Sequence, residues 1–373
     1  MSRPQVAVDP PLIRPALAEL VPYEPGKPVE EVQRELGLER VVKLASNEGP
    51  FGPFPSALEA IERAARDLNR YPDGGAYRLR QALAARHGVG FDEVTVCAGA
   101  DAVIGYLVLA TLDPGDEAVT CWPSFPSYVL DPLKVAGVPV RVPLREDRFD
   151  LEAMLAAVTP RTKLAFVAAP NNPTGTTSTR AELDAYFARV PRHVLTVLDQ
   201  AYFEYVDHPD YPDGIEEYLK AGHRVLVLRT FSKIFGLAGL RVGYGVGPKE
   251  VITAVGKVRR AFDVASAGQE AALASLDDPA EIERRRAVNA EGIALLERVL
   301  RERGLEPAGP AVANFLFVRV GDAEALNGAL LRQGVIVRPM GPFGAPDALR
   351  ITVGTPDEIV FLADALDAVA APA

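Results

Sequence analysis

Lys233 is the residue that first suggests chemistry in this chain. It ends the segment Thr230-Phe231-Ser232-Lys233, which directly follows a Val- and Leu-rich run that we expect to be a buried strand. Burial makes an amine easier to deprotonate, and a neutral amine can form a Schiff base with an aldehyde. The hydroxyls of Thr230 and Ser232, with the guanidinium of Arg241, suit a phosphate group. Taken alone, such a segment is more often a solvated lysine beside a helix N-cap.

Asp199 is a second candidate, because it ends the apolar strand expected over residues 194–198. Burying a carboxylate in that position is energetically unfavourable unless the charge is paired, and a protonated ring nitrogen would be a suitable partner. The nearby Tyr202 could donate a hydrogen bond to a phenolic oxygen. The ordinary alternatives are a turn or helix-cap aspartate and a packed tyrosine, and for an isolated aspartate the cap is the commoner case.

Three further segments carry groups that could bind a ligand. Asn171-Asn172-Pro173-Thr174-Gly175 is a strong turn signal that could also hold an amide rigidly. Gly99-Ala100-Asp101 opens an apolar helix, whose first N–H groups form an anion site or simply favour a nearby aspartate. Phe125 could stack on a planar ring, although most aromatic side chains belong to the core.

All of these candidates follow predicted strands. From about residue 56 to 260, short β-branched runs alternate with helical patterns, which predicts a mostly parallel sheet covered by helices on both faces. We expect strands at residues 94–97, 117–121, 163–169, 194–198 and 225–228, and a capping box at Thr179 to Glu182. In such a sheet, ligands bind beyond the carboxyl ends of the strands. The candidates therefore share one edge, which is the predicted site.

The two ends of the chain have a different character. Residues 1–40 are proline-rich with little regular pattern, and we interpret them as an arm that joins the small domain and the active site. We expect a large domain over residues 41–270 and a small α+β domain over 271–373. For the small domain the pattern predicts a helix at 279–303, a strand at 314–320, a helix at 323–333, strands at 335–338 and 349–353, and a helix at 356–370.

Composition excludes several classes of protein. The chain has 373 residues, of which 48% are hydrophobic, and a net charge of −10, which disfavours nucleic-acid binding without a basic stripe. Cys97 and Cys121 form neither a disulfide framework nor a metal pattern, and the four histidines lack metal-ligand spacing, so we expect no metal. No dinucleotide fingerprint, Walker loop or nucleophile elbow is present. Without a signal peptide or a membrane-spanning run, we expect a cytoplasmic protein that binds no membrane.

The order of these signals along the chain is more specific than any one of them. Asn-Pro-Thr-Gly at 172–175, Asp-x-Ala-Tyr at 199–202 and Thr-Phe-Ser-Lys at 230–233, followed by Arg241, resemble the aspartate-aminotransferase fold family, whose cofactor is pyridoxal 5'-phosphate. The resemblance implies the α/β architecture called fold type I. In that architecture a large domain, with a mostly parallel sheet sandwiched by helices, is joined to a smaller α+β domain.

Within that family, the similarity runs nearly end to end to the histidinol-phosphate aminotransferases. It includes Pro22–Pro28, Lys43–Glu48, Arg70–Asp73, Pro170–Gly175, Gly334–Pro339 and Leu349–Thr355. The resemblance implies a ping-pong reaction through Lys233 that interconverts histidinol phosphate and 2-oxoglutarate with imidazole-acetol phosphate and glutamate. This is a step of histidine biosynthesis.

The resemblance also implies a role for each matching residue. Two would be catalytic: Lys233 would hold the cofactor covalently, and Asp199 would pair with its ring nitrogen. The other cofactor contacts would come from Ala100, Asp101, Phe125, Asn172, Tyr202, Thr230, Ser232, Arg241 and, across a homodimer interface, Tyr71. The amino donor and the oxo-acid acceptor would be bound by Tyr23, Asn47, Arg338 and Arg350.

Some positions depart from the family's usual pattern. Gly49 follows Asn47-Glu48 where the family often has Asn-Pro, while Trp122, Phe125 and Phe343 occupy segments where a tyrosine is frequent. These changes make the pocket rim more apolar. They leave an aromatic amino-acid aminotransferase as the nearest alternative and a decarboxylase of phosphorylated amino acids as the second. A cofactor-binding regulator would need an appended basic DNA-binding motif, and a structural protein would be colourless when purified.

Overall fold

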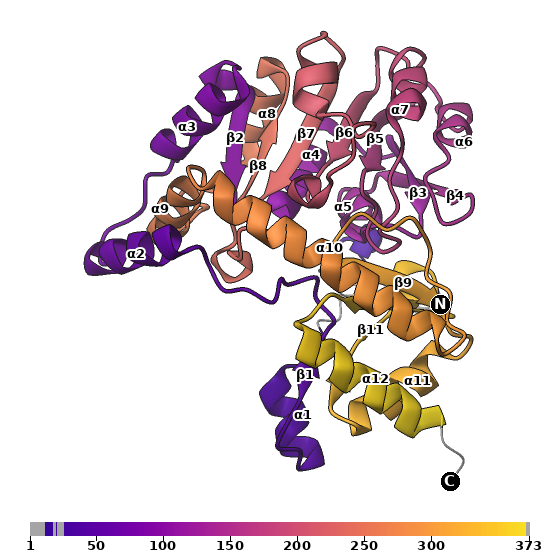
Figure 1. The fold of residues 1–373 in the computed structure, drawn as a ribbon. Helices are drawn as coiled ribbons and strands as arrows, with labels where there is room; N and C mark the ends of the chain where they lie inside the picture. Colours follow the sequence, from indigo (N-terminus) through magenta and orange to yellow (C-terminus); the bar gives the residue numbers. More distant parts are fainter. Residues whose placement is uncertain (1–11, 18–19, 21–25, 371–373) are drawn as a thin grey trace, which may run out of the picture.

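A seven-stranded sheet forms the centre of the larger part of the molecule (Figure 1). The computed structural model describes residues 12–17, 20 and 26–370. The strand order is β2-β8-β7-β6-β5-β3-β4, and every neighbouring pair is parallel except the two that involve β8. The strands are β2 Val94–Cys97, β3 Glu117–Trp122, β4 Val138–Pro143, β5 Thr162–Ala168, β6 Leu195–Asp199, β7 Val225–Thr230 and β8 Gly243–Val246.

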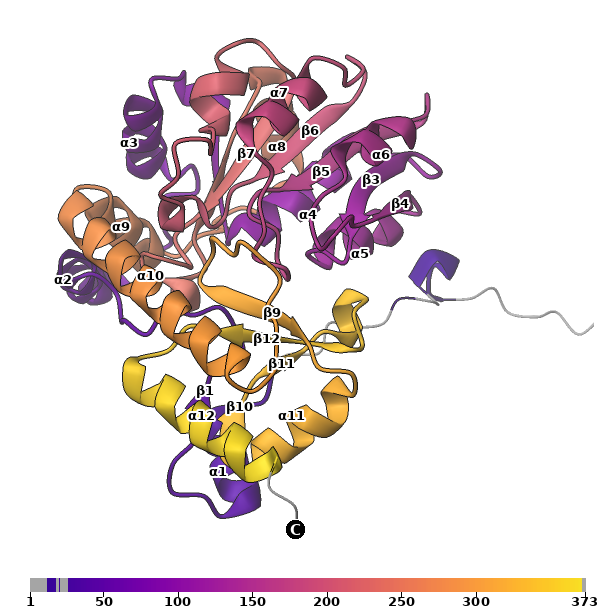
Figure 2. The same ribbon diagram turned by 45° about the vertical axis from the view of Figure 1, so that its right-hand side comes forward.

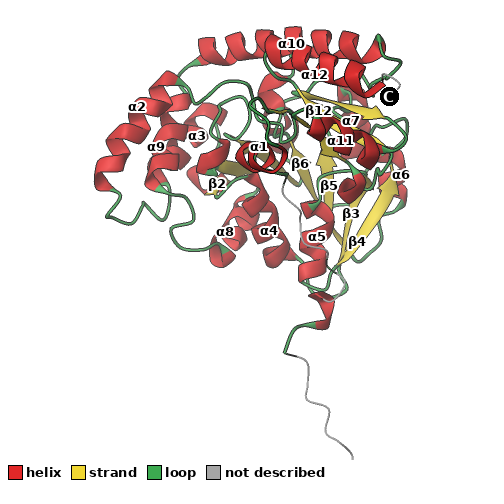
Figure 3. Ribbon diagram, turned by 90° about the horizontal axis from the view of Figure 1, so that it is seen from below, coloured by secondary structure: helices red, strands yellow, loops and turns green. Residues whose placement is uncertain are grey.

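Helices cover both faces of this sheet, as the strand–helix alternation predicts (Figure 3). α4 (Ala100–Thr111), α5 (Ser127–Lys134) and α8 (Lys249–Val258) pack together on one face, and α6 (Leu151–Ala156) and α7 (Arg180–Phe187) on the other. Beyond the β2 edge lie α2 Pro55–Ala64, α3 Tyr77–His87 and α9 Ser266–Ser275. The central strands β5, β6 and β7 are almost wholly buried, which explains why they are apolar along their whole length.

The smaller part of the molecule is built on an antiparallel sheet of order β11-β12-β9 (Figure 2). Its elements are α10 Pro279–Arg301, β9 Phe315–Arg319, α11 Ala323–Arg332, β10 Val335–Ile336, β11 Arg338–Pro339, β12 Ala348–Thr352 and α12 Pro356–Ala370. α10 connects the two parts, because Ile282 near its start packs in the large core while Leu296 and Leu300 near its end pack in the small one.

The remaining regular segments are single helical turns and two short elements near the N-terminus. These are η1 Pro15–Leu17, α1 Val29–Leu36, β1 Val42–Lys43, η2 Ala65–Asp67, η3 Phe91–Glu93, η4 Phe203–Tyr205, η5 Ile215–Leu219, η6 Ala238–Leu240 and η7 Gly341–Phe343. Two sequence-based expectations are wrong here. Residues 29–36 form a helix, although their region has little periodic pattern. The single strand expected at 335–338 is two strands, because β10 pairs with β1 while β11 pairs with β12.

The described residues contain neither a helix suited to crossing a membrane nor a cluster of metal-ligating side chains. Both cysteines, Cys97 and Cys121, are buried and free. The capping box predicted at the start of α7 is present, with the Thr179 hydroxyl accepting from the Glu182 backbone N–H and the Glu182 carboxylate accepting from the Thr179 N–H. The local signals in the sequence therefore place this helix start correctly.

Candidate active site

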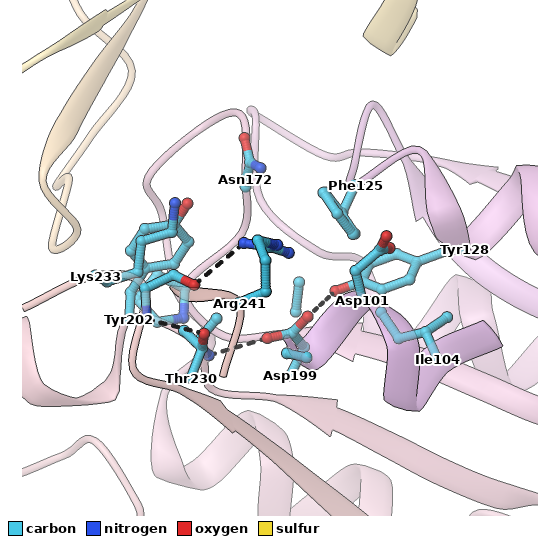
Figure 4. A pocket seen from close by; sticks show the side chains of 15 residues that line it. Asp101, Ile104, Phe125, Tyr128, Asn172, Asp199, Tyr202, Thr230, Lys233 and Arg241 are labelled. Atoms are coloured by element: carbon cyan, nitrogen blue, oxygen red, sulfur yellow. Dashed lines mark hydrogen bonds between the residues drawn. The ribbon is translucent and has the colours of Figure 1, made fainter. Parts of the chain in front are cut away.

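One pocket opens where β5, β6 and β7 end (Figure 4). Its lining includes every predicted cofactor contact except Tyr71: Ala100, Asp101, Phe125, Asn172, Asp199, Tyr202, Thr230, Ser232, Lys233 and Arg241. Ile104, Tyr128, Ala168, Pro170 and Ala201 complete it. The residues come from loops and helix starts far apart in the sequence, and they meet because parallel strands deliver their carboxyl ends to a single edge.

Asp199 lies at the base of the pocket as the last residue of β6, and it is only 8% exposed. Each of its carboxylate oxygens accepts one hydrogen bond. The Ala201 backbone N–H donates to Oδ1 at 2.9 Å, and the Tyr128 hydroxyl donates to Oδ2 at 2.6 Å. Burial raises the pKa of Asp199, while these two donors act in the opposite direction. A cationic ring nitrogen placed above the carboxylate would fit this environment.

Lys233 borders the same pocket from a different side (Figure 4). Its Nζ lies 3.4 Å from the Asn47 carbonyl oxygen and 5.5 Å from the centre of the Tyr202 ring. Burial, helped by the positive charges of Arg350 and Arg241, lowers the pKa of this amine to about 8. More of the amine is therefore neutral near physiological pH than in an ordinary lysine, and the neutral amine is the form that attacks an aldehyde.

The opposite end of the pocket is suited to an anion. It contains the first turn of α4, the hydroxyls of Thr230 and Ser232, and Arg241, whose Nη1 is 3.5 Å from Ser232 Oγ. Gly99 makes room for the guanidinium: its φ is +90°, and a Cβ there would lie 2.6 Å from Arg241 Nη2. A helix N-terminus, two hydroxyls and an arginine form a typical phosphate site. Together with Asp199 and Lys233, this donor set fits pyridoxal phosphate.

Asn47 connects the pocket to the small sheet. Its Nδ2 donates to the Tyr202 hydroxyl at 2.8 Å, and its Oδ1 accepts from the Thr352 hydroxyl of β12 at 3.1 Å. The backbone N–H of Asn47 donates to that same hydroxyl oxygen at 3.0 Å. Asn47 has a φ of +54°, a left-handed conformation that asparagine tolerates better than most residues. These bonds bring a predicted substrate contact next to a predicted cofactor contact.

Arg338 and Arg350 lie side by side, directly opposite each other on β11 and β12. Both are buried, and the Phe343 ring centre lies 5.9 Å and 5.5 Å from their guanidinium carbons. Arg350 reaches the pocket through Asn172, to whose Oδ1 it donates at 2.5 Å, and it also donates to the Ala45 carbonyl at 2.7 Å. Two adjacent cations therefore lie on an apolar base beside Asn172 of the pocket, where the resemblance predicts substrate contacts.

The structure does not bring Tyr71 to the pocket of its own chain. Tyr71 is 81% exposed and stacks on Phe262, with the ring centres 4.7 Å apart. Its position away from the pocket of its own chain is compatible with the expected role across a subunit interface. Tyr23 lies outside the described residues.

Sequence reasoning overlooked Tyr128 as a functional residue. The predicted site residues do not include it, yet its hydroxyl bonds to Asp199 and its ring meets Phe125 edge-on at 5.7 Å. A helix start that follows a predicted strand end faces the ligand edge of the sheet. That position is the one signal that could have singled out the tyrosine.

The fold and this site define a pyridoxal-phosphate type of transferase, and comparison with known proteins agrees. The chain belongs to the aminotransferase class I and II family, whose model matches residues 39–366. Histidinol-phosphate aminotransferase of Moorella thermoacetica is 46% identical over 92% of this chain and 89% of its own length. Histidinol-phosphate aminotransferase 2 of Pseudomonas fluorescens Pf-5 is 43% identical over 97% of this chain and 98% of its own.

Solved structures show the same similarity in three dimensions. The histidinol-phosphate aminotransferase of Sinorhizobium meliloti, in complex with pyridoxal-5'-phosphate, superposes with a TM-score of 0.86 at 30% identity, covering 96% of this chain and 97% of that one. A mutant aspartate aminotransferase of Thermus thermophilus superposes with a TM-score of 0.84 at 26% identity, covering 96% and 99%. The predicted fold class is therefore confirmed.

Proposed function

We propose that this protein is a pyridoxal-phosphate-dependent aminotransferase that exchanges an amino group between histidinol phosphate and 2-oxoglutarate. The observation that carries the proposal is the convergence of Lys233, Asp199 and an anion site in one pocket. The choice of histidinol phosphate is supported by relatives of that name, which are 43–46% identical over more than nine-tenths of the chain.

Lys233 and Asp199 have different roles in the proposed reaction. When bound, pyridoxal phosphate supplies an electron-withdrawing ring that stabilises negative charge at the substrate α-carbon. Lys233 would hold the cofactor, and its Nζ would be the base that carries the substrate α-proton. Holding this amine beside the α-carbon makes the proton transfer intramolecular. Asp199 would pair with the ring nitrogen.

The remaining pocket residues orient the cofactor. The start of α4, Thr230, Ser232 and Arg241 would bind its phosphate, and Phe125 would pack on the ring. Tyr202 and Asn172 would bind the phenolic oxygen, and Tyr202 is held in place by its 2.8 Å bond to Asn47. Because Asn172 also accepts from Arg350, the orientation of the cofactor is linked to the group that binds the substrate.

Arg350 and Arg338 bind the acidic groups of both substrates in turn. A guanidinium can bind a carboxylate or a phosphate with two parallel hydrogen bonds, so one pair of arginines can accept glutamate and then a phosphorylated imidazole. The apolar Phe343 and Phe125 rings at this rim also suit an aromatic side chain, which keeps an aromatic aminotransferase as the second candidate.

We further propose a cytoplasmic homodimer in which Tyr71 completes the phosphate site of the partner subunit. The exposed Tyr71–Phe262 stack and the two reduced, buried cysteines support this. The proposed domains remain an arm, a large domain and a small domain. The pairing of β1 with β10 favours moving the first boundary from residue 41 to about 45.

Mixing two inactive variants tests the dimer. Lys233→Ala subunits lack the reactive amine, and Tyr71→Ala subunits lack the group donated to the partner. A mixed dimer contains one site with both residues intact, so cofactor affinity and activity should return when the variants are unfolded, mixed and refolded together. No recovery from subunits that refold well alone would contradict the shared site.

A substrate panel tests the reaction itself. Histidinol phosphate, phenylalanine and threonine phosphate are each supplied with 2-oxoglutarate, and glutamate formation and CO2 release are measured. We expect the fastest glutamate formation with histidinol phosphate and parallel initial-rate lines, the sign of a ping-pong reaction. Preference for phenylalanine would establish the second candidate, and CO2 release from threonine phosphate would show a decarboxylase.

A further inference from the structure

Tyr128 is held unusually firmly beside the catalytic carboxylate. Its side chain is 1% exposed and stacks on Phe166, with the ring centres 4.8 Å apart and the planes within 8° of parallel. Its hydroxyl donates to Asp199 Oδ2 at 2.6 Å, a contact drawn in Figure 4. Because the ring cannot move away without disturbing the core under the sheet, the phenol is a fixed donor.

Asp199 needs such a donor if it is to stay charged. Burial favours the neutral acid, and the negative charge of Asp101 at the start of α4 acts in the same direction. The groups that favour the carboxylate are Tyr128 on α5, the Ala201 backbone N–H and the charge of Lys233. The two hydrogen bonds are the contacts from neutral groups that offset burial.

The ring nitrogen and Asp199 share a single proton, which can lie on either partner. With the proton on nitrogen, the pair consists of a cationic ring and a carboxylate. With the proton on oxygen, it consists of a neutral ring and a carboxylic acid. A hydrogen bond donated to Asp199 stabilises the first arrangement more than the second, because a carboxylate is a stronger acceptor than a carboxylic acid. Only the first gives the ring its full electron-withdrawing power.

We propose that Tyr128 is a positioning residue that holds Asp199 in its charged form and thereby keeps the cofactor's ring nitrogen protonated. The inference rests on the proposed function, since it requires pyridoxal phosphate in the pocket. It also assigns Tyr128 a second contact, because the tyrosine meets Phe125 edge-on and so holds the residue proposed to pack on the ring. One side chain thus positions two of the groups that contact the cofactor.

The test is the protonation state of the ring nitrogen in Tyr128→Phe, measured by 15N NMR on holoenzyme loaded with ring-labelled pyridoxal phosphate. We expect the wild-type nitrogen to be protonated and the variant signal to move toward that of an unprotonated pyridine. The visible absorption of the holoenzyme should titrate at a different pH in the variant. Turnover should fall about ten- to a hundredfold, the factor expected for losing one hydrogen bond to a charged group.

Tyr186→Phe is the matched control. Tyr186 is another tyrosine that is 1% exposed, and its hydroxyl lies 3.2 Å from Thr196 Oγ1, away from the pocket. The same substitution there should leave the nitrogen signal, the absorption titration and turnover unchanged. Equal effects from both variants would show a general loss of packing and overturn the assignment.

Two results separate this inference from the proposed function. If wild-type protein takes up no pyridoxal phosphate, the proposed function fails. If the wild type is loaded and Tyr128→Phe gives the same nitrogen signal, only the role of Tyr128 fails. Should Tyr128→Phe not fold, 3-fluorotyrosine at position 128 keeps the ring and makes the phenol a stronger donor. An absorption titration displaced from that of the wild type would then support the role, and an unchanged one would overturn it.

Discussion

The two halves of the site are built in different ways. The cofactor half uses strand ends and helix starts of one parallel sheet, so its groups are fixed by a single buried core. The proposed substrate half uses Arg338 and Arg350 on a separate antiparallel sheet, packed on a second core. Hydrogen bonds between Asn47 and Tyr202 and between Arg350 and Asn172 join the halves. Because the two sets of residues lie on separate sheets, substitutions near Arg338 and Arg350 can change the substrate that is bound while the cofactor site stays intact.

The largest effect should come from breaking the cofactor half at Lys233. Lys233→Ala removes both the covalent anchor and the proton carrier, so turnover should fall by about 10⁴-fold or more. Borohydride reduction followed by peptide mapping should label Lys233 in the wild type and no residue in the variant. Lys249→Ala, at a surface lysine paired with Asp92, should behave as wild type. Appreciable activity in Lys233→Ala would refute its role.

A substitution in the proposed substrate half should impair substrate binding much more than cofactor binding. Arg350→Gln removes the proposed anion contact, so kcat/KM for both substrates should fall about a hundred- to a thousandfold, comparable to losing a charge-assisted pair of hydrogen bonds. Cofactor affinity should change much less. Arg301→Gln, at a surface ion pair with Glu297 and Glu306, provides the control. A large loss of cofactor binding in Arg350→Gln would show that the halves are not separable.

Gly99 and Gly115 offer a sharper test of the phosphate end. Their φ values are +90° and +88°, but a Cβ would meet Arg241 at 2.6 Å only at Gly99 and nothing within 4 Å at Gly115. Each alanine variant should lose about 1–3 kcal/mol of stability from backbone strain. Only Gly99→Ala should also weaken pyridoxal phosphate binding, by about tenfold or more. Absorbance titration measures the affinity for pyridoxal phosphate, and chemical denaturation measures stability. Equal cofactor affinities of the two variants would contradict a phosphate site beside Gly99.

The smallest expected effect is a shift in the pH dependence of cofactor uptake. The Lys233 amine attacks an aldehyde only when neutral, so cofactor uptake by the apoprotein should be slow at pH 6, rise with pH and level off above its pKa of about 8. Arg350 lowers this pKa through its positive charge. In Arg350→Gln the midpoint should therefore move to higher pH, while Arg301→Gln should leave it in place. Stopped-flow absorbance at several pH values measures the midpoint in each variant. A shift of the Arg350→Gln midpoint to lower pH would contradict the prediction.

The sequence alone determined the parts of this protein that depend on local signals. Val- and Leu-rich runs marked the central strands, and polar or glycine-bearing residues after them marked the ligand edge. Turn and capping residues such as Thr179 acted within a few residues of their own position. Because parallel strands bring their ends together, these signals sufficed to predict that the loops after the central strands would meet at one site.

Only the tertiary structure decided the contacts between segments that are distant in sequence. No local pattern shows that Tyr128 reaches Asp199, that Arg338 lies opposite Arg350, or that β1 joins β10. The lowered pKa of Lys233 is likewise a property of its surroundings, since burial and Arg350 act on it from other elements. The physical reason is common to all of them: strand register, burial and charge pairing exist only once the separate segments have packed together.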